Sequence, residues 1–114
     1  MKLSEIRDIL QCNVLTGDNS LSTEVETVVA SDGMSEILAF ARPGALMITG
    51  LTNVQAMRTA DIAHVRAVIF IRGKRPTESV LELARKHNIP VLATAFGMFD
   101  VCGILRENGL KGGM

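Results

Sequence analysis

Three apolar runs in the second half of the chain constrain the fold more than any other feature. They occupy residues 45–49, 67–71 and 89–93, so their starts lie 22 residues apart, and each is followed by a glycine-containing turn and a helical pattern. Continuous apolar runs, without polar alternation, are typical of strands that helices cover on both faces. The runs therefore predict a parallel sheet whose crossovers are right-handed.

Helical periodicity fills the segments between these runs. In residues 53–63, Val54, Met57 and Ala60 fall on one helical face. The next segment, 76–87, opens on a proline, a residue that suits the first turn of a helix. Apolar residues spaced by three and four also run through 96–107. We interpret these stripes as core, because packing against a sheet is the usual meaning of such periodicity.

The first half of the chain is less regular. Ser4 is expected to cap a short helix through Leu10, and small strands are expected at 12–15 and 25–30. A further helix over 37–41 would end at a Pro-Gly pair. The sequence thus predicts a single domain over residues 1–114. Its expected fold is α/β, a small three-layer α/β/α domain with a mainly parallel sheet of about four or five strands. Residues 110–114 are expected to form a flexible tail.

Composition excludes several classes of function. The chain carries 12 basic and 12 acidic side chains and only four aromatic residues, all Phe, so a nucleic-acid partner is not expected. No apolar run reaches the length of about 18 residues that a membrane span needs, and charges interrupt the first apolar segment where an export signal would lie. Cys12 and Cys102 lack metal or redox spacing. We expect reduced thiols in a cytoplasmic protein, with no metal and no cofactor.

Candidate ligand-binding residues follow from the expected fold, because open parallel α/β sheets bind ligands outside the carboxyl ends of their strands. Small and hydroxyl residues ahead of a helix suit a phosphate or carboxylate, and arginine can clamp an oxyanion through two parallel hydrogen bonds. The ligand-binding candidates are Asp32, Thr49, Gly50, Thr52, Asn53, Arg72, Gly73, Lys74, Arg75 and Thr94. A phosphate-loop motif and a dinucleotide-binding motif are both missing, so the glycines alone are a weak signal.

An ordinary structural interpretation competes with each of these candidates. The basic turn at 72–75 can be a solvated connection, and Thr52 or Asn53 can simply cap a helix. Asp32 has no acid or base in its own turn, so its structural role would be to cap the helix that begins near Met34.

No catalytic residues can be assigned from the sequence. His64 and His87 lie near expected helix ends, where a structural role is the simpler interpretation. Cys12 and Cys102 fall in segments that are expected to be buried, and a thiol in apolar surroundings is inert.

Two phrases and the order of elements from Ile9 onward resemble the DRTGG domain family. The phrases are A-L-M-I-T-G at 45–50 and R-P-T-E-S-V-L-E-L-A-R-K-H-N-I-P-V-L at 75–92. The DRTGG domain is similar to the N-terminal domain of bacterial HPr kinase/phosphorylase. Members of the family occur beside CBS domains in regulated pyrophosphatases and within some phosphotransacetylases.

The family name comes from an Asp-Arg pair after one strand and a Thr-Gly-Gly sequence after the next. Here the first position is G-L-T-N at 50–53 and the second is R-G-K at 72–74, so only Gly73 is clearly kept. Other phrases, such as S-D-G-M-S-E-I-L-A-F at 31–40, look like a stand-alone branch in anaerobic bacteria. Genes of that branch often neighbour those of iron hydrogenase and of electron-transfer subunits similar to NADH dehydrogenase.

The resemblance implies a non-catalytic module. In the kinase, phosphoryl transfer belongs to a separate P-loop domain, and this chain has neither that motif nor the length to hold the domain. In the pyrophosphatases the DRTGG segment is an accessory element that self-associates, while adenine nucleotides bind the CBS domains. Kinase activity is therefore not expected here.

Three functions are weighed on this basis. The first is a regulatory or assembly module that forms a homodimer and docks on a partner protein such as a redox complex. An apolar patch around Met34, Phe40, Met98 and Phe99 would support it, because Met and Phe are favoured at interfaces. The second is a sensor that binds a small anionic ligand, a nucleotide or acyl phosphate, between 49–53 and 72–75. The third, an enzyme, lacks a nucleophile, a base or a metal cluster.

Overall fold

A six-stranded sheet forms the centre of the computed structural model, which describes residues 1–114. The strand order is β1-β5-β4-β3-β2-β6; β1 is antiparallel to β5, and all other neighbours are parallel. The elements are α1 (Leu3–Ile9), β1 (Asn13–Thr16), η1 (Asp18–Ser20, a 3-10 helix), β2 (Thr27–Ala30), α2 (Met34–Phe40), β3 (Leu46–Thr49), α3 (Val54–Ile62), β4 (Ala67–Phe70), α4 (Glu78–Lys86), β5 (Val91–Ala93), α5 (Met98–Glu107) and β6 (Lys111–Gly112). The predicted α/β class is confirmed, although the sheet has more strands than the expected four or five.

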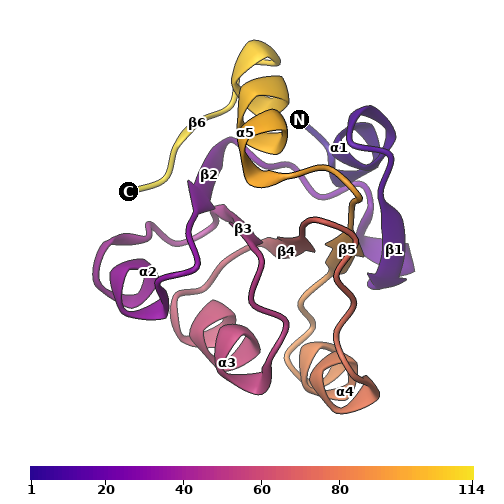
Figure 1. The fold of residues 1–114 in the computed structure, drawn as a ribbon, viewed down its shortest axis with the longest axis vertical. Helices are drawn as coiled ribbons and strands as arrows, with labels where there is room; N and C mark the ends of the chain where they lie inside the picture. The colour runs from indigo at the N-terminus through magenta and orange to yellow at the C-terminus, as the bar shows by residue number, and fades with distance from the viewer.

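The helices cover both faces of the sheet in three layers. Figure 1 shows α2, α3 and α4 on one side, with α1 and α5 on the other. The side chains of β3 alternate between these layers: Met47 packs with the α2–α4 side, whereas Leu46 and Ile48 pack with the α1 and α5 side. Both faces of the central strands are thus buried in apolar surroundings, which explains why their sequences run without polar alternation.

A bulge marks the antiparallel edge of the sheet. Val14 pairs with Leu92 and Thr16 pairs with Val91. Between these two pairs β1 moves on by two residues while β5 moves on by one. At this point the buried hydroxyl of Thr16 donates to the carbonyl of Ile89 at 3.0 Å and accepts the amide of Val91 at 3.1 Å. The side chain therefore takes over hydrogen bonds that the backbone ladder loses at the bulge.

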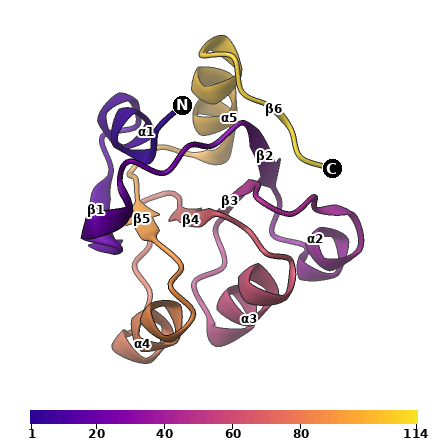
Figure 2. The same ribbon diagram turned by 180° about the vertical axis from the view of Figure 1, so that it is seen from behind.

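The last residues, expected to be a flexible tail over 110–114, lie against the sheet. Leu110 is buried, and Lys111–Gly112 form β6 beside the start of β2. Gly113 donates to the carbonyl of Val28 at 2.8 Å and accepts the amide of Arg42 at 2.7 Å. In Figure 2, which shows the molecule from behind, this segment runs beside β2. Tertiary contacts order a stretch that has no strand pattern of its own.

Several helix starts differ from those expected. The residue at the N-cap of α1 is Lys2 instead of Ser4, and Glu5 reaches back to the Lys2 amide at 2.9 Å. In α4 the N-cap is Thr77, so Pro76 precedes the helix. The expected cap at Asn53 is confirmed: its side chain accepts the amide of Ala56 at 2.9 Å. None of the helices is long and apolar enough to cross a membrane.

Candidate functional site

The loops that follow β2, β3 and β4 meet at the carboxyl edge of the sheet. Register brings them together, because Ala30 lies opposite Ile48 and Thr49 lies opposite Phe70. We call this surface the loop edge and define it by the residues 31–33, 49–53, 72–75 and 94–99. It is the edge at which the fold predicts a ligand, since parallel α/β sheets bind ligands at the carboxyl ends of their strands.

Asp32 ties the loop after β2 to the end of β3. One of its carboxylate oxygens, Oδ1, accepts the Gly50 amide at 2.7 Å and the hydroxyl of buried Thr49 at 3.0 Å. The expectation that Asp32 caps α2 is wrong. Gly33 occupies that N-cap, and its amide donates to the Ser31 hydroxyl at 2.8 Å.

These contacts favour the charged form of the Asp32 side chain. The Gly50 N–H bond has the largest effect and lowers the carboxyl pKa, while the Thr49 hydroxyl and the charges of Arg72 and Lys74 act in the same direction. Partial burial opposes them but does not outweigh them. The carboxylate is therefore a fixed negative charge at the loop edge.

The basic turn adopts an unusual backbone conformation. Arg72 and Gly73 both have positive φ, 57° and 69°, and the Lys74 amide donates to the Ile71 carbonyl at 3.2 Å. Two positive φ values in a four-residue turn are typical of type I′, which needs glycine or a strained residue. The left-handed conformation of Arg72 costs about 1–2 kcal/mol. Two hydrogen bonds offset this cost: the Arg72 amide donates to the Phe96 carbonyl at 2.8 Å, and the Gly73 amide donates to the Thr94 carbonyl at 2.9 Å.

The two cations of this turn lie over Gly50. A Cβ atom at position 50 would be 2.6 Å from Nη2 of Arg72, so the guanidinium lies directly on the glycine backbone. Nζ of Lys74 donates to the Gly50 carbonyl at 3.3 Å. Neither cation forms an ion pair within the chain. Gly50 thus leaves room for the flexible Arg72 side chain to lie against the backbone, and neither cation has a carboxylate within 4.0 Å.

Five of the ten predicted site residues form one network, and the other five lie around it on the same edge. Asp32, Thr49, Gly50, Arg72 and Lys74 form the network, and Gly73 is part of the turn that presents it. Asn53 caps α3 beside it. The hydroxyl of Thr94 is buried and donates to the Leu10 carbonyl at 2.6 Å, so it is not available to a ligand. Thr52 and Arg75 lie on the loop edge outside the network.

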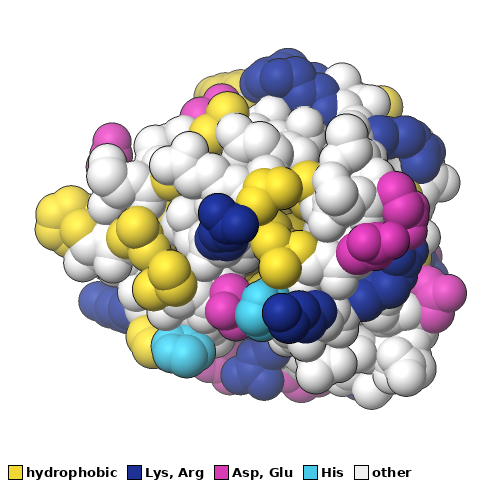
Figure 3. Space-filling model, turned by 90° about the horizontal axis from the view of Figure 1, so that it is seen from below, with side chains coloured by type: hydrophobic (Ala, Val, Ile, Leu, Met, Phe, Trp, Pro, Cys, Tyr) yellow, Lys and Arg dark blue, Asp and Glu magenta, His cyan; other side chains and the backbone are white.

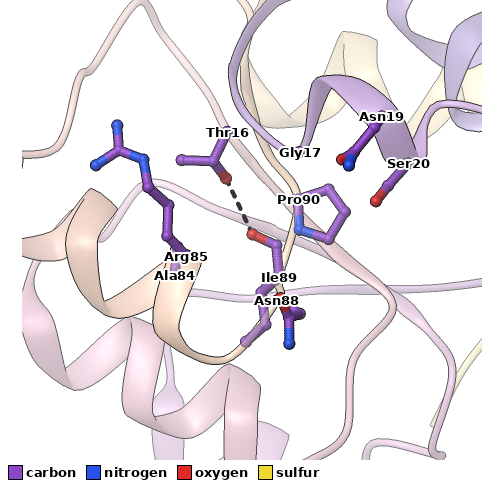
Figure 4. A pocket seen from close by; sticks show the side chains of 9 residues that line it. All are labelled: Thr16, Gly17, Asn19, Ser20, Ala84, Arg85, Asn88, Ile89 and Pro90. Atoms are coloured by element: carbon purple, nitrogen blue, oxygen red, sulfur yellow. Dashed lines mark hydrogen bonds between the residues drawn. The ribbon is translucent and has the colours of Figure 1, made fainter.

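The loop edge is not hollowed. Five hollows indent the surface, and residues of the network line none of them. Figure 4 shows one of these hollows, between η1 and the end of α4, where Asn19 and Ser20 face Pro90 and the Arg85 side chain extends away. Small-molecule sites are usually concave, so the shape of the loop edge suits contact with a larger surface.

An exposed aromatic side chain lies beside the basic turn. Phe99, in the first turn of α5, is 89% exposed, and the preceding loop is joined to the turn by the bond from Arg72 to Phe96. The predicted patch is only partly present, because Met34 is buried and Phe40 lies on α2. On the side formed by α2, α3 and α4, hydrophobic side chains occur in separate groups among charged ones (Figure 3).

The remaining titratable residues do not form a reactive cluster. Burial raises the pKa of Cys12 to about 12 and also raises that of Cys102, as expected for unreactive thiols. Nδ1 of His87 lies 3.4 Å from Oδ1 of Asp61, and this contact links the end of α4 to α3. No three His, Cys, Asp or Glu side chains converge in a way that could hold a metal ion.

Family membership follows from a match over nearly the whole chain. A model of the DRTGG domain matches residues 5–107. The chain belongs to the DRTGG domain family. No curated protein matches it in sequence.

Among solved structures, this DRTGG domain is similar to one whose description reads "Crystal structure of the CBS and DRTGG domains of the regulatory region of Clostridium perfringens pyrophosphatase complexed with activator, diadenosine tetraphosphate". The TM-score is 0.79 at 22% sequence identity, and the likeness covers 91% of this chain and 45% of that one. The chain thus spans less than half of its structural neighbour. The likeness shows a shared fold, and in the neighbour that fold is part of a regulatory region.

Proposed function

We propose that this DRTGG domain is a non-catalytic regulatory or assembly module that acts by association through its loop edge. The observation that carries the proposal is that the loop edge has no hollow and presents an exposed aromatic ring, Phe99, as well as two cations with no carboxylate within 4.0 Å. Aromatic residues and arginine are enriched at protein interfaces, where they contribute most of the binding energy.

One partner in this association is a second copy of the chain. The backbone of the loop edge is held by bonds from Asp32, Thr49 and Lys74, so little conformational entropy is lost when another surface docks on it. The same surface also docks on a partner protein. The sequence resembles a stand-alone branch of the family whose genes lie near hydrogenase genes, and this favours a redox complex as the partner. In this proposal the domain regulates by occupying a surface of its partner.

Light scattering after size-exclusion chromatography tests self-association. We expect the wild-type chain to be dimeric at high micromolar concentration and Phe99→Ser to be monomeric. Phe40→Ser is the matched control, because Phe40 is also exposed, at 64%, but lies at the end of α2 outside the loop edge. A monomeric wild type, or a dimer that survives Phe99→Ser, would refute self-association through this surface.

A second candidate is the binding of an anionic ligand at the same edge. The cations of Arg72 and Lys74 converge on Gly50. Asp32 interacts electrostatically with both, but neither cation has a carboxylate within 4.0 Å. The structural neighbour was crystallised with diadenosine tetraphosphate, which is an anion of this kind. Each charge-assisted bond to a shielded oxyanion contributes about 1.5–3 kcal/mol.

A thermal-shift titration with diadenosine tetraphosphate, ATP and inorganic phosphate tests the anion candidate. Saturation at a hundredfold over Kd should add about 2.7 kcal/mol to the free energy of unfolding. We expect Arg72→Ala with Lys74→Ala to abolish the shift, whereas Arg58→Ala on α3 should keep it. Equal shifts in both variants would show that Arg72 and Lys74 are not the binding groups.

A further inference from the structure

A hollow at the opposite edge of the sheet carries charged groups that the loop edge does not use. It has a volume of about 540 Å³ and no hydrophobic lining. It lies at the amino ends of β2, β3 and β4: Thr27 begins β2, Arg66 immediately precedes β4, and Gly44 precedes β3 by two residues. We call it the amino-edge hollow. Arg42, Arg66, Glu24 and Glu26 supply its charges.

The backbone that carries Arg42 is rigid. Arg42 opens a turn in which Pro43 is followed by Gly44 at φ 88°, and the Ala45 amide donates back to the Arg42 carbonyl at 3.3 Å. Proline followed by a residue of positive φ is the signature of a type II turn. The Arg42 amide also donates to Gly113 at 2.7 Å, which anchors this turn to the segment after β6.

Arg66 is held against the same turn. Its amide donates to the Ala45 carbonyl at 2.8 Å, and the Gly44 amide donates to the His64 carbonyl at 2.8 Å. Nη2 of Arg66 lies 3.4 Å from the position that a Cβ atom on Gly44 would occupy, so its guanidinium rests on the turn that Arg42 begins. Two guanidinium groups are therefore presented from one braced unit.

Opposite charges line this hollow without pairing across it. Neither Arg42 nor Arg66 has a carboxylate within 4.0 Å, although Glu24 and Glu26 line the same space. The backbone of Glu26 is fixed, because its carbonyl accepts the Lys111 amide at 3.1 Å. Glu24 already pairs with the N-terminal ammonium of Met1 at 3.4 Å, so Glu26 is the carboxylate left to face a bound cation. A bare anion would be attracted to the arginines but repelled by Glu26, and a bare cation would be attracted to Glu26 but repelled by the arginines. A molecule with both charges satisfies both sets.

We propose that the amino-edge hollow binds a small zwitterion of the amino-acid class. Its carboxylate lies between the guanidinium groups of Arg42 and Arg66, and its ammonium group faces Glu26. No large apolar side chain lines the hollow, so we expect the bound molecule to carry a small polar side chain or none. The backbone at Arg42 and Arg66 is fixed by hydrogen bonds, so binding has to order only their side chains.

Isothermal titration calorimetry with glycine, L-glutamine and L-glutamate as probes tests this proposal. At least one of them is expected to bind, whereas acetate, inorganic phosphate and putrescine, which carry one kind of charge only, are expected to bind at least about tenfold more weakly. Failure of all three amino acids to bind, or equal binding of phosphate or acetate, would overturn the proposal.

Three variants assign the binding groups. Arg66→Gln and Glu26→Gln should each weaken binding of the amino acid by about tenfold or more, since each removes one charge-assisted contact. Arg58→Gln is the matched control, because Arg58 is an exposed arginine on α3 outside the hollow. All three positions are exposed, so we expect the variants to keep the wild-type circular dichroism spectrum. Equal losses in the control, or none in the other two, would refute this assignment.

The result is independent of the loop-edge proposal. Phe99→Ser should leave binding of the amino acid unchanged, so the failure of one proposal does not imply the failure of the other. If Arg66→Gln instead dissociated a wild-type dimer and no amino acid bound, the hollow would be a contact between copies and the zwitterion proposal would be wrong.

Discussion

A single carboxylate oxygen joins two strand ends in this protein. Oδ1 of Asp32 accepts both the Gly50 amide and the Thr49 hydroxyl, and the charges of Arg72 and Lys74 lie close enough to lower the Asp32 pKa further. Nothing in the turn S-D-G-M-S-E indicates this role, because every partner belongs to the end of β3, to the loop that follows it or to the turn after β4. A residue that looks like a helix cap thus organises the loop edge instead.

Replacing Asp32 separates its hydrogen bonds from its charge. Asp32→Ala removes both and should lower the free energy of unfolding at neutral pH by about 1–2 kcal/mol. Asp32→Asn can still accept both bonds and should cost less. Because the folded pKa lies below the ordinary 3.8, the charge stabilises the fold above that value, and this stabilisation is lost as pH falls through the folded pKa.

Urea unfolding at a series of pH values measures this effect. The advantage of the wild type over Asp32→Asn should be constant from about pH 7 to about pH 5 and shrink below about pH 4. A difference that grows as the pH falls would contradict the lowered pKa of Asp32.

At the scale of elements, helix ends are set by different devices. The N-terminus of α3 is capped by the Asn53 side chain, whereas Thr77 at the N-cap of α4 makes no such bond and pairs with Ser79 at 3.0 Å instead. Three helices continue into a non-glycine residue with positive φ, at Gln11, His64 and Asn88. These turns stop the helices without the glycine that usually marks such a position.

The two N-caps provide a matched pair of substitutions. Asn53→Ala should lower the free energy of unfolding by about 1 kcal/mol, because an amide at the start of α3 loses its acceptor. Thr77→Ala should cost no more than a few tenths of a kcal/mol, since no helix amide depends on its side chain. Thermal or urea unfolding measures both changes. An equal loss of unfolding free energy in the two variants would show that the Asn53 hydrogen bond does not stabilise α3.

The central elements were predictable and the outer ones were not. The runs at 67–71 and 89–93 became β4 and β5 because burial on both faces leaves an unbroken apolar sequence. β6 has only Lys111 and Gly112, and its partner β2 is more than eighty residues away in the sequence, so no local pattern marks it. Thr94 was misjudged for the same reason: its acceptor, the Leu10 carbonyl, lies 84 positions earlier.

At the scale of the whole molecule, the last residues connect three parts of the fold. Lys111 bonds to Glu26, and Gly113 bonds to both Val28 and Arg42. A Cβ atom on Gly113 would lie 3.0 Å from that of Ala45 and 3.2 Å from Cγ1 of Val29, so glycine fits a narrow space over the core. The segment thus closes the sheet and braces the turn that carries Arg42.

Truncation after Leu110 tests this bracing. We expect the shortened chain to melt about 4 °C or more below the wild type, because three backbone hydrogen bonds and the cover over Val29 are lost. Removing only Met114, which is 46% exposed, should change little. Differential scanning calorimetry distinguishes the two cases, and an unchanged melting temperature after the longer truncation is the result expected of a flexible tail.

The bulge in β1 has a consequence for how the protein behaves at high concentration. A straight outer strand offers a row of free amides and carbonyls on which other chains can stack into fibrils. Here one edge strand, β1, has a bulge at which the Thr16 hydroxyl takes the place of backbone hydrogen bonds to β5. The other edge strand, β6, has only two residues. Both ends of the sheet are therefore poor templates for polymerisation, and crowding should produce discrete assemblies instead of filaments.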